Sequence, residues 1–433
     1  MKKDTFKKSI FILLFGGLMT KVFGFIIRIL STRTLGPEGI SYLTIVMPTY
    51  SLFITLSSLA LPISISKMVS ENKMRSKRIF FSTCFFILFF LSILIFLIFL
   101  TAPFIANNLL RQPKVYPLIL AMAFTLPFIS ITSFLKGYFL GKLKVHPNVI
   151  SNFFEQITRI LFILFLLPKI ISYGLLYGVI SYILLNGLTE FISILVFSSF
   201  LPHKIALTKE DIKPNKNIIK EMLQTSLPSM SSRVFGNIGF FLEPILLTNL
   251  LLFSGYSSSY ILKEYAAYNA YAIGLLTLPS FFVAAICQIL IPEVSKYRSQ
   301  NNTVMLKKRI REALSYSFII GLFSSIFLFF SRDFLLNLLY KTTLGSDYIF
   351  ILAPFFVLFY LEAPLSSILE ASGFAKKSFF ITFWGVILKL VILSVLSLCH
   401  IGLYSLVFSE IINIIFVVVL SFKALKKVIP PRL

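Results

Sequence analysis

About twelve long apolar segments run through this chain of 433 residues, and they constrain its fold more than any other feature. About 20 apolar residues of helix are enough to cross the hydrocarbon core of a bilayer. The segments have approximate limits of 9–34, 40–66, 79–107, 115–139, 147–168, 171–200, 218–250, 262–293, 310–331, 346–371, 376–398 and 401–422. Charged residues make up 13% of the chain, whereas a soluble domain carries about 25%. The sequence therefore predicts an all-α, multi-pass membrane protein.

The connections between these segments alternate in charge. Lysine and arginine gather in every even-numbered connection and in both terminal segments, and the odd-numbered connections are poor in them. The even-numbered sets are Lys67, Lys73, Arg75, Lys77 and Arg78; Lys136, Lys142 and Lys144; Lys204, Lys209, Lys213, Lys216 and Lys220; Lys296, Arg298, Lys307, Lys308, Arg309 and Arg311; and Lys376 and Lys377. Cytoplasmic loops collect these residues. The pattern predicts a plasma-membrane protein with both termini cytoplasmic, and it explains the net charge of +24 without nucleic acid as a partner.

The longest polar stretch divides the predicted spans into two sets of six. We expect an N-terminal lobe at 1–202, a cytoplasmic loop at 203–217 and a C-terminal lobe at 218–433. Short matches suggest that the lobes are repeats: 189–192 (TEFI) resembles 409–412 (SEII), and 65–67 (ISK) resembles 294–296 (VSK). Two parallel lobes with a substrate site between them are an architecture of transporters.

The first predicted span contains two cations, Lys21 near its middle and Arg28 seven residues later. Residues seven apart lie on nearly the same face of a helix. A cation at the centre of a membrane helix costs about 2.5–3.5 kcal/mol on insertion scales. One interpretation is that this face lines a polar cavity. The alternative is that the two side chains snorkel or pair with carboxylates of other helices.

The fifth predicted span begins with a polar stripe. Asn148, Asn152, Glu155 and Arg159 recur at helical spacing, so they share one face. Glu155 and Arg159 are four residues apart and can pair with each other. The stripe is either a cavity wall for a polar substrate or a self-neutralised contact between helices.

The seventh predicted span holds Arg233 and Glu243. Ten residues separate them, which places them about 15 Å apart along the helix, too far for direct pairing. Pro244 should kink or break the helix after Glu243. Arg233 is a candidate for a cavity, and Glu243 is a candidate either for the cavity or as a partner of Lys21 or Arg28. By the repeat, Lys389 corresponds to Arg159 and Glu410 to Glu190, which favours matching structural roles in the two lobes.

The chain has no motif of the common enzyme classes. It lacks a phosphate-binding loop of the nucleotide-binding kind, an HExxH zinc motif and a serine elbow. The three cysteines lie far apart in apolar segments and predict neither disulfides nor a metal site. We therefore expect a protein that is not an enzyme and has no cofactor. Coupling to a Na⁺ or H⁺ gradient, or to the membrane potential, remains open.

Several motifs resemble the stage V sporulation protein B group. They are 21–24 (KVFG), 59–72 (LALPISISKMVSEN), 136–141 (KGYFLG) followed by Pro147 and 155–159 (EQITR), 232–234 (SRV) and 242–244 (LEP). This group belongs to the multidrug/oligosaccharidyl-lipid/polysaccharide (MOP) exporter superfamily, with the multidrug (MATE) exporters and the lipid II flippases. The resemblance implies a MATE-like fold and alternating access. Members of the group often have 14 helices, whereas about 12 are predicted here.

The resemblance also implies a function. A polyprenyl-pyrophosphate-linked oligosaccharide or cell-wall precursor would be moved across the membrane, with basic cavity residues holding the diphosphate. The predicted partners are this lipid-linked sugar and the surrounding lipids, and the oligomeric state is left open. The candidate substrate-binding residues are Lys21, Arg28, Asn152, Glu155, Arg159, Arg233 and Glu243. The alternatives are a cation-coupled multidrug antiporter of the same fold and a non-transporting scaffold for cell-envelope synthesis.

Overall fold

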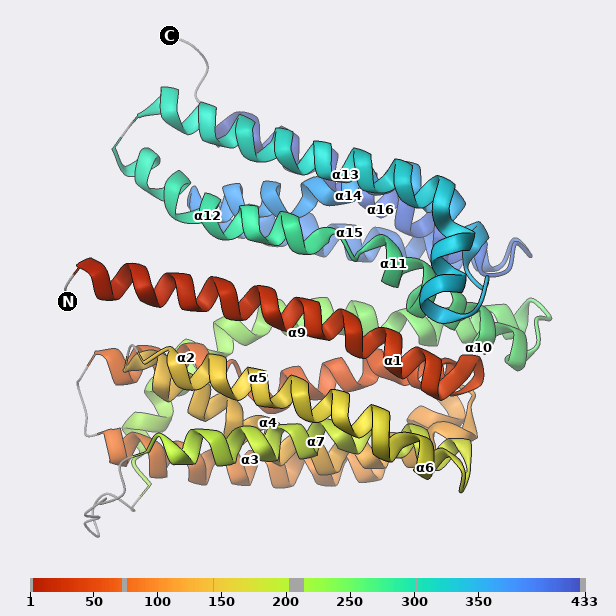
Figure 1. Cartoon of the computed structure of the whole chain (residues 1–433), viewed down its shortest axis with the longest axis horizontal. Helices are drawn as coiled ribbons and strands as arrows, with labels where there is room; N and C mark the ends of the chain where they lie inside the picture. Colours follow the sequence, from red (N-terminus) through yellow and green to blue (C-terminus); the bar gives the residue numbers. More distant parts are fainter. Residues whose placement is uncertain (1–2, 72–75, 143, 202–213, 301, 429–433) are drawn as a thin grey trace. The chain divides into compact units, whose positions relative to one another are not determined.

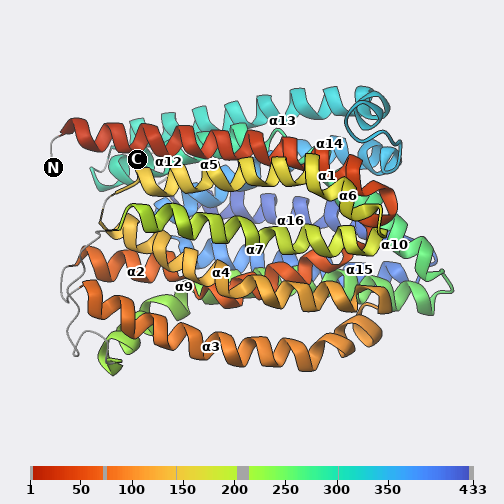
Figure 2. The same ribbon diagram turned by 60° about the horizontal axis from the view of Figure 1, so that its bottom comes forward.

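The computed structural model describes residues 3–71, 76–142, 144–201, 214–300 and 302–428, and these residues form helices and turns without any strand. The chain divides into two compact units, Met1–Phe241 and Leu242–Leu433. Figure 1 and Figure 2 show the long helices of each unit lying side by side with roughly aligned axes. Each unit therefore forms a helical bundle of its own.

Unit 1 begins with a helix that is too long for one crossing. α1 (Lys3–Ser58) has 56 residues, or about 84 Å of helix, against a hydrocarbon core of about 30 Å. The helix is broken at Gly36, which has φ 68° and ψ 176°. Figure 1 shows the chain of α1 turning back on itself. Glycine tolerates this positive φ at no steric cost, and Pro37 follows as the first residue of the returning helix. α1 thus supplies both the first predicted span and most of the second.

The rest of unit 1 packs around α4 (Tyr116–Gly141). This helix contacts α1, α2, α3 and α7. The remaining elements are α2 (Leu61–Ser70), α3 (Ser76–Phe104), η1 (Ile105–Leu109), η2 (Pro113–Val115), α5 (His146–Leu161), η3 (Phe162–Leu166), α6 (Leu167–Ile171), α7 (Leu175–Ser199) and the first part of α9 (Lys216–Phe253). α4 approaches the backbone of α2 closely, because a Cβ on Gly137 would lie 2.9 Å from Pro62 Cα and one on Gly141 2.7 Å from Ser66 O.

Unit 2 packs around α14 (Ser346–Ala371), which contacts α12, α13, α15 and α16. Its other elements are the end of α9, α10 (Ser258–Ala266), η4 (Ala267–Ile273), α11 (Gly274–Leu276), α12 (Ser280–Ser299), α13 (Thr303–Tyr340), α15 (Ala375–Ser397) and α16 (Tyr404–Val428). Part of its core is formed by Leu365, Ile368 and Leu369 of α14 against Val294 of α12 and Ile310 of α13. The apolar faces of these helices are therefore buried against α14.

The observed helices agree with the predicted spans. Among the described residues, nine helices are long and apolar enough to cross a membrane, and a tenth candidate is a pair bent by 54° between Leu276 and Ser280. This count leaves out two further predicted spans. The segment Met19–Ser70 is counted once although the chain reverses within it, and the segment 146–171 is divided among α5, η3 and α6. The kink or break expected at Pro244 does not interrupt α9, which is helical from Lys216 to Phe253.

The two compact units do not divide where the sequence analysis placed the lobe boundary. Most of the expected loop, 203–217, lies outside the described residues, and the division falls inside α9 at Phe241 and Leu242. The first part of α9 bonds to unit 1, since Asn237 Nδ2 donates to Thr55 Oγ1 at 2.8 Å. The last part bonds to unit 2, where Ser254 Oγ donates to the carbonyl of Ser397 at 2.9 Å. These contacts explain why the predicted boundary at 203–217 and the observed division differ.

Candidate functional site

A lysine between two glutamates forms the centre of the charge cluster in unit 1. Lys136 Nζ on α4 lies 3.1 Å from Glu155 Oε1 on α5 and 4.0 Å from Glu190 Oε2 on α7. Ser193 Oγ donates to Glu155 Oε1 at 2.7 Å, and Thr132 Oγ1 donates to Glu190. The three charged side chains are mostly buried, with Lys136 26% exposed and Glu155 8%. The cluster therefore ties three helices together through ionic contacts.

The polar stripe of α5 faces this cluster. Asn148 is buried and its Nδ2 lies 3.5 Å from the carbonyl of Lys136, whereas Asn152 is half-buried. Arg159 Nη2 donates to Thr189 Oγ1 on α7 at 3.2 Å. Over the described part of the chain, no ion pair joins Glu155 to Arg159, because Glu155 binds Lys136 on a neighbouring helix instead. The alternative in which Glu155 and Arg159 neutralise each other is therefore wrong, whereas the helical geometry of α5 confirms that the polar residues share one face.

Unit 2 contains a second lysine between two glutamates. Lys389 Nζ on α15 lies 2.6 Å from Glu243 Oε2 on α9 and 2.6 Å from Glu410 Oε2 on α16. The Glu243 side chain is 4% exposed, and Tyr265 OH lies 3.4 Å from its other oxygen. Glu243 therefore forms its ion pair with Lys389. Lys21 and Arg28, the candidate partners from the sequence, are not in this ion pair.

Two of the predicted cations have exposed side chains inside apolar helices. Lys21 lies 18 residues after the start of α1, and Arg233 lies 17 residues after the start of α9. At 1.5 Å per residue these positions are about 27 Å and about 26 Å along their helices. Both residues are exposed, and none of the ion pairs between described residues includes either of them. Arg28 is half-buried.

The structure thus separates the candidate residues into two kinds. Glu155 and Glu243 are partners of buried lysines, whereas Lys21 and Arg233 are exposed. Sequence reasoning assigned Lys136 to a cytoplasmic connection and missed that it is the centre of a cluster. The number of carboxylates in the predicted spans could have indicated this role of Lys136, because each buried carboxylate requires a cation or a proton.

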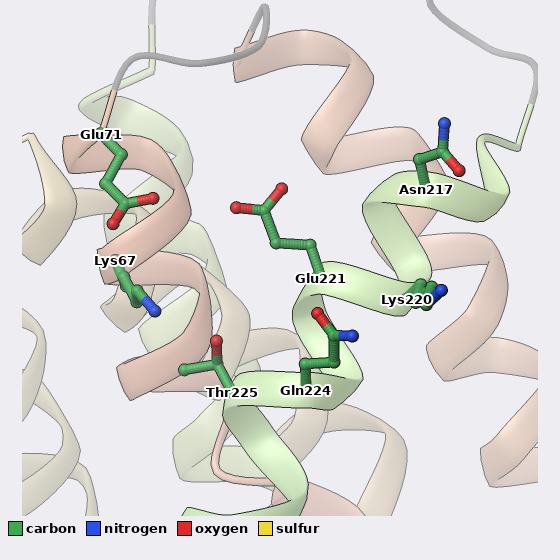
Figure 3. Close-up of a pocket in the computed structure, with 7 residues that line it drawn as sticks. All are labelled: Lys67, Glu71, Asn217, Lys220, Glu221, Gln224 and Thr225. Atoms are coloured by element: carbon green, nitrogen blue, oxygen red, sulfur yellow. The ribbon is translucent and has the colours of Figure 1, made fainter.

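A polar pocket lies at one end of unit 1, between α2 and α9. Its volume is about 450 Å³, and Figure 3 shows Glu221 and Thr225 of α9 on the side that faces Lys67 of α2 and Glu71, the residue that follows α2. The remaining lining residues are Asn217, Lys220 and Gln224. The formal charges of its two lysines and two glutamates sum to zero.

Comparison with solved structures defines the class of protein. The fold matches an inward-facing multidrug resistance MATE family transporter of the MOP superfamily with a TM-score of 0.76, at 17% identity and over 94% of each chain. It matches the lipid II flippase MurJ in an inward closed conformation with a TM-score of 0.70, at 16% identity, over 96% of this chain and 87% of the other. The chain is a multi-pass membrane protein with the fold of the MOP exporters, as predicted.

The sequence comparisons identify the family within this class. A family model described as polysaccharide biosynthesis protein matches residues 6–298, which is more than half of the chain, so the chain belongs to that family. The stage V sporulation protein B of Bacillus subtilis (strain 168) is 29% identical over 444 residues, covering 99% of this chain and 85% of the relative. The resemblance stated from the sequence motifs is therefore confirmed.

Proposed function

We propose that this protein is a flippase that moves a polyprenyl-pyrophosphate-linked oligosaccharide or cell-wall precursor across the membrane by alternating access. The family, described as polysaccharide biosynthesis protein, supports a role in supplying sugars for the cell envelope. The structural similarity to a lipid II flippase supports a lipid-linked substrate. The proposed substrate has two distinct ends, an anionic diphosphate headgroup and an apolar tail that stays among lipids.

The observation that carries this proposal is the exposure of Lys21 and Arg233 within apolar helices. A cation held by carboxylates has its charge neutralised and cannot attract a phosphate strongly, as with Lys136 and Lys389. Lys21 and Arg233 have no carboxylate partner among the described residues. Phosphate oxygens form charge-assisted hydrogen bonds with lysine and arginine. We therefore assign the diphosphate to Lys21 and Arg233, with Arg28 and Arg159 as further candidates.

The pairing of the carboxylates makes a cationic substrate less suitable. A multidrug antiporter for cations would need accessible carboxylates, and four of the embedded ones are already paired: Glu155 and Glu190 face Lys136, and Glu243 and Glu410 face Lys389. Among the described residues, Glu362, which lines a pocket of unit 2, is in no ion pair. The four paired carboxylates favour the flippase over the antiporter of the same fold, and Glu362 is the position at which a cationic substrate would have to bind if the antiporter were correct.

Reconstitution of the full chain into liposomes tests the proposal. Transbilayer movement of a labelled polyprenyl-pyrophosphate sugar is followed after addition of a membrane-impermeant quencher. A hydrogen bond to a charged group contributes about 1.5–3 kcal/mol, which corresponds to about 10- to 100-fold in affinity. We expect Lys21→Ala and Arg233→Ala each to lower the rate by at least about tenfold at limiting substrate.

The matched control is Lys169→Ala, which removes an exposed lysine at the end of α6. It should transport at the wild-type rate. Equal transport by wild type and Lys21→Ala would contradict the assigned role of Lys21. Failure of the wild type to move any lipid-linked sugar, while binding to envelope-synthesis proteins persists, would favour the scaffold.

A further inference from the structure

An apolar groove lies between α4 and α7 on the surface of unit 1. Its volume is about 360 Å³, and its walls are formed by Phe124 and Phe128 of α4 and by Phe191 and two leucines of α7. Phe124 is 61% exposed and Phe191 is 44% exposed, so the groove is open to the surroundings of the helices. None of the seven described residues that line the groove is charged. The groove therefore suits an apolar ligand that enters from the lipid.

Contacts between aromatic rings hold the walls of the groove in place. The rings of Phe128 and Phe191 meet edge to face across the two helices, with their centroids 6.0 Å apart. The ring of Phe124 meets that of Phe99 of α3 in the same way, also at 6.0 Å. Aromatic pairs prefer this geometry, which adds to the stability of their packing. The groove is thus a preformed feature of three packed helices.

Two small buried residues form the floor of the groove, Thr125 of α4 and Gly187 of α7. The hydroxyl of Thr125 lies 2.7 Å from the hydroxyl of Tyr50 and donates to the carbonyl of Met122, also at 2.7 Å. Its hydrogen bonds are therefore made inside unit 1. The methyl group of Thr125 lies toward α7, since a Cβ on Gly187 would be 3.4 Å from Thr125 Cγ2. The glycine leaves the place of a side chain empty, which deepens the groove.

The groove lies near the middle of the membrane. α4 and α7 are both long and apolar enough to be membrane spans, and their 26 and 25 residues correspond to about 39 Å and about 38 Å of helix. Phe124 and Phe128 lie about 12 Å and about 18 Å from the start of α4, and Gly187 lies about 18 Å from the start of α7. The middle of a bilayer is equally far from both of its surfaces, so a chain bound there can belong to a headgroup on either side.

We propose that this groove binds the isoprenoid tail of the lipid-linked substrate, an inference that rests on the function proposed above. The tail stays among lipids while its diphosphate headgroup crosses the membrane. A tail segment held at mid-depth keeps the substrate attached to unit 1 throughout this movement, because either surface is equally close from that point. The groove is distinct from the cations assigned to the diphosphate, since all of its lining residues are uncharged.

The shape and stiffness of an isoprenoid favour it over the acyl chains of ordinary lipids. Lipid chains are as apolar as leucine, so burial from water does not drive binding within a bilayer, and close packing decides instead. Each isoprene unit has a double bond that cannot rotate and a methyl branch. Ordering such a chain costs less conformational entropy than ordering a saturated chain of equal length. Its methyl branches can fill the space beside Gly187, which a straight chain leaves empty.

Photolabelling of the full chain in lipid nanodiscs tests tail binding without transport. The probe is a polyprenol with a diazirine on its terminal isoprene unit, and it has neither a phosphate nor a sugar. After irradiation, mass spectrometry should find the label on the α4 and α7 peptides that contain the groove. Excess unlabelled polyprenol should remove most of this label, whereas a saturated alcohol with the same number of carbons should not. Equal competition by both alcohols would indicate ordinary lipid contact and would overturn the proposal.

Variants of the groove make the test specific. Gly187→Leu fills the groove and Phe191→Ala removes part of its wall, and each should lower the labelling at least about fivefold, equivalent to about 1 kcal/mol of binding free energy. Phe89→Ala is the matched control, because Phe89 is an exposed phenylalanine of α3 that does not line the groove, and it should label as the wild type does. If Gly187→Leu folds poorly, Phe191→Ala still decides the outcome, and undiminished labelling in that variant would contradict the tail site.

Transport is a separate measurement in the liposome assay. Phe191→Ala should lower the rate at limiting substrate, and Phe89→Ala should not. Competed labelling in a wild type that moves no lipid-linked sugar would support the tail site and contradict the flippase. Transport by a wild type without competed labelling would contradict the tail site alone.

Discussion

At the scale of single residues, each unit is stabilised by a buried lysine that binds two glutamates from two other helices. Lys389 is more enclosed than Lys136, with side chains 16% and 26% exposed. Its two ionic contacts, both 2.6 Å, are also shorter. Breaking a buried ion pair is strongly destabilising because the remaining charge is left without compensation, at a cost of about 3–5 kcal/mol. The cost should be highest at Lys389.

We therefore predict that Lys389→Met lowers the free energy of unfolding by about 3–5 kcal/mol. The substitution leaves Glu243 and Glu410 facing each other without a cation. Unfolding of the purified protein in detergent, followed by tryptophan fluorescence or by thermal aggregation, measures the loss. Lys376→Met, an exposed position on the same helix, should change stability by less than about 0.5 kcal/mol.

A second variant separates charge from packing in this cluster. Replacing all three residues, as Glu243→Gln, Lys389→Met and Glu410→Gln together, removes the uncompensated charge and should regain most of the stability. If the triple variant is as unstable as Lys389→Met alone, then the loss comes from packing, and the ionic explanation is wrong.

At the scale of helices, α4 and α2 approach so closely that the contact requires glycine. Gly137 and Gly141 are four residues apart, so they lie on the same face of α4 and allow its backbone to contact α2. Both glycines belong to the motif at 136–141 that resembles the stage V sporulation protein B group, but the motif alone gives no physical reason for them. The structure supplies the physical reason, because a side chain at either position would meet the backbone of α2.

We predict that Gly141→Ala destabilises unit 1 by about 1–3 kcal/mol, a typical cost of inserting a methyl group into a packed contact. The nearest atom, Ser66 O at 2.7 Å, belongs to the backbone and cannot rotate away. The control is Gly24→Ala, since nothing lies within 4 Å of a Cβ at that helical glycine. It should be neutral or stabilise the helix by about 0.5–1 kcal/mol. Equal unfolding midpoints for the two variants would contradict the close-contact explanation.

The helices were predictable from sequence, but their ionic partners were not. Apolar length and flanking charge located the spans to within a few residues, as for α14, because burial in lipid imposes length and hydropathy on each helix separately. The partner of Glu243 is Lys389, 146 residues away in the chain. Such a pairing depends on how helices pack, and no local spacing rule specifies it. The four-residue spacing along α5 instead suggested an ion pair between Glu155 and Arg159. In the structure Glu155 forms its ion pair with Lys136 of α4.

At the scale of the whole molecule, α9 connects the two compact units as one continuous helix of 38 residues. Asn237, in its unit 1 part, bonds to Thr55, and Glu243, less than two turns later, bonds to Lys389. A substitution in this helix near Phe241 can therefore act on both units. The distribution of lysine and arginine among the connections is also a property of the whole molecule, because it concerns the orientation of every helix in the membrane.

The final prediction is the orientation of the chain in the membrane, which follows from the positive charge of the even-numbered connections. In a variant with all three native cysteines replaced, we introduce single cysteines at two exposed positions, Tyr173 between α6 and α7 and Gln300 between α12 and α13. A membrane-impermeant maleimide added to intact cells should label Tyr173→Cys, and it should label Gln300→Cys only after the membrane is permeabilised. Permeabilised cells provide the control for accessibility of both sites. The reverse labelling pattern would contradict an arrangement with both termini in the cytoplasm, and it would also reverse the side from which the diphosphate reaches Lys21 and Arg233.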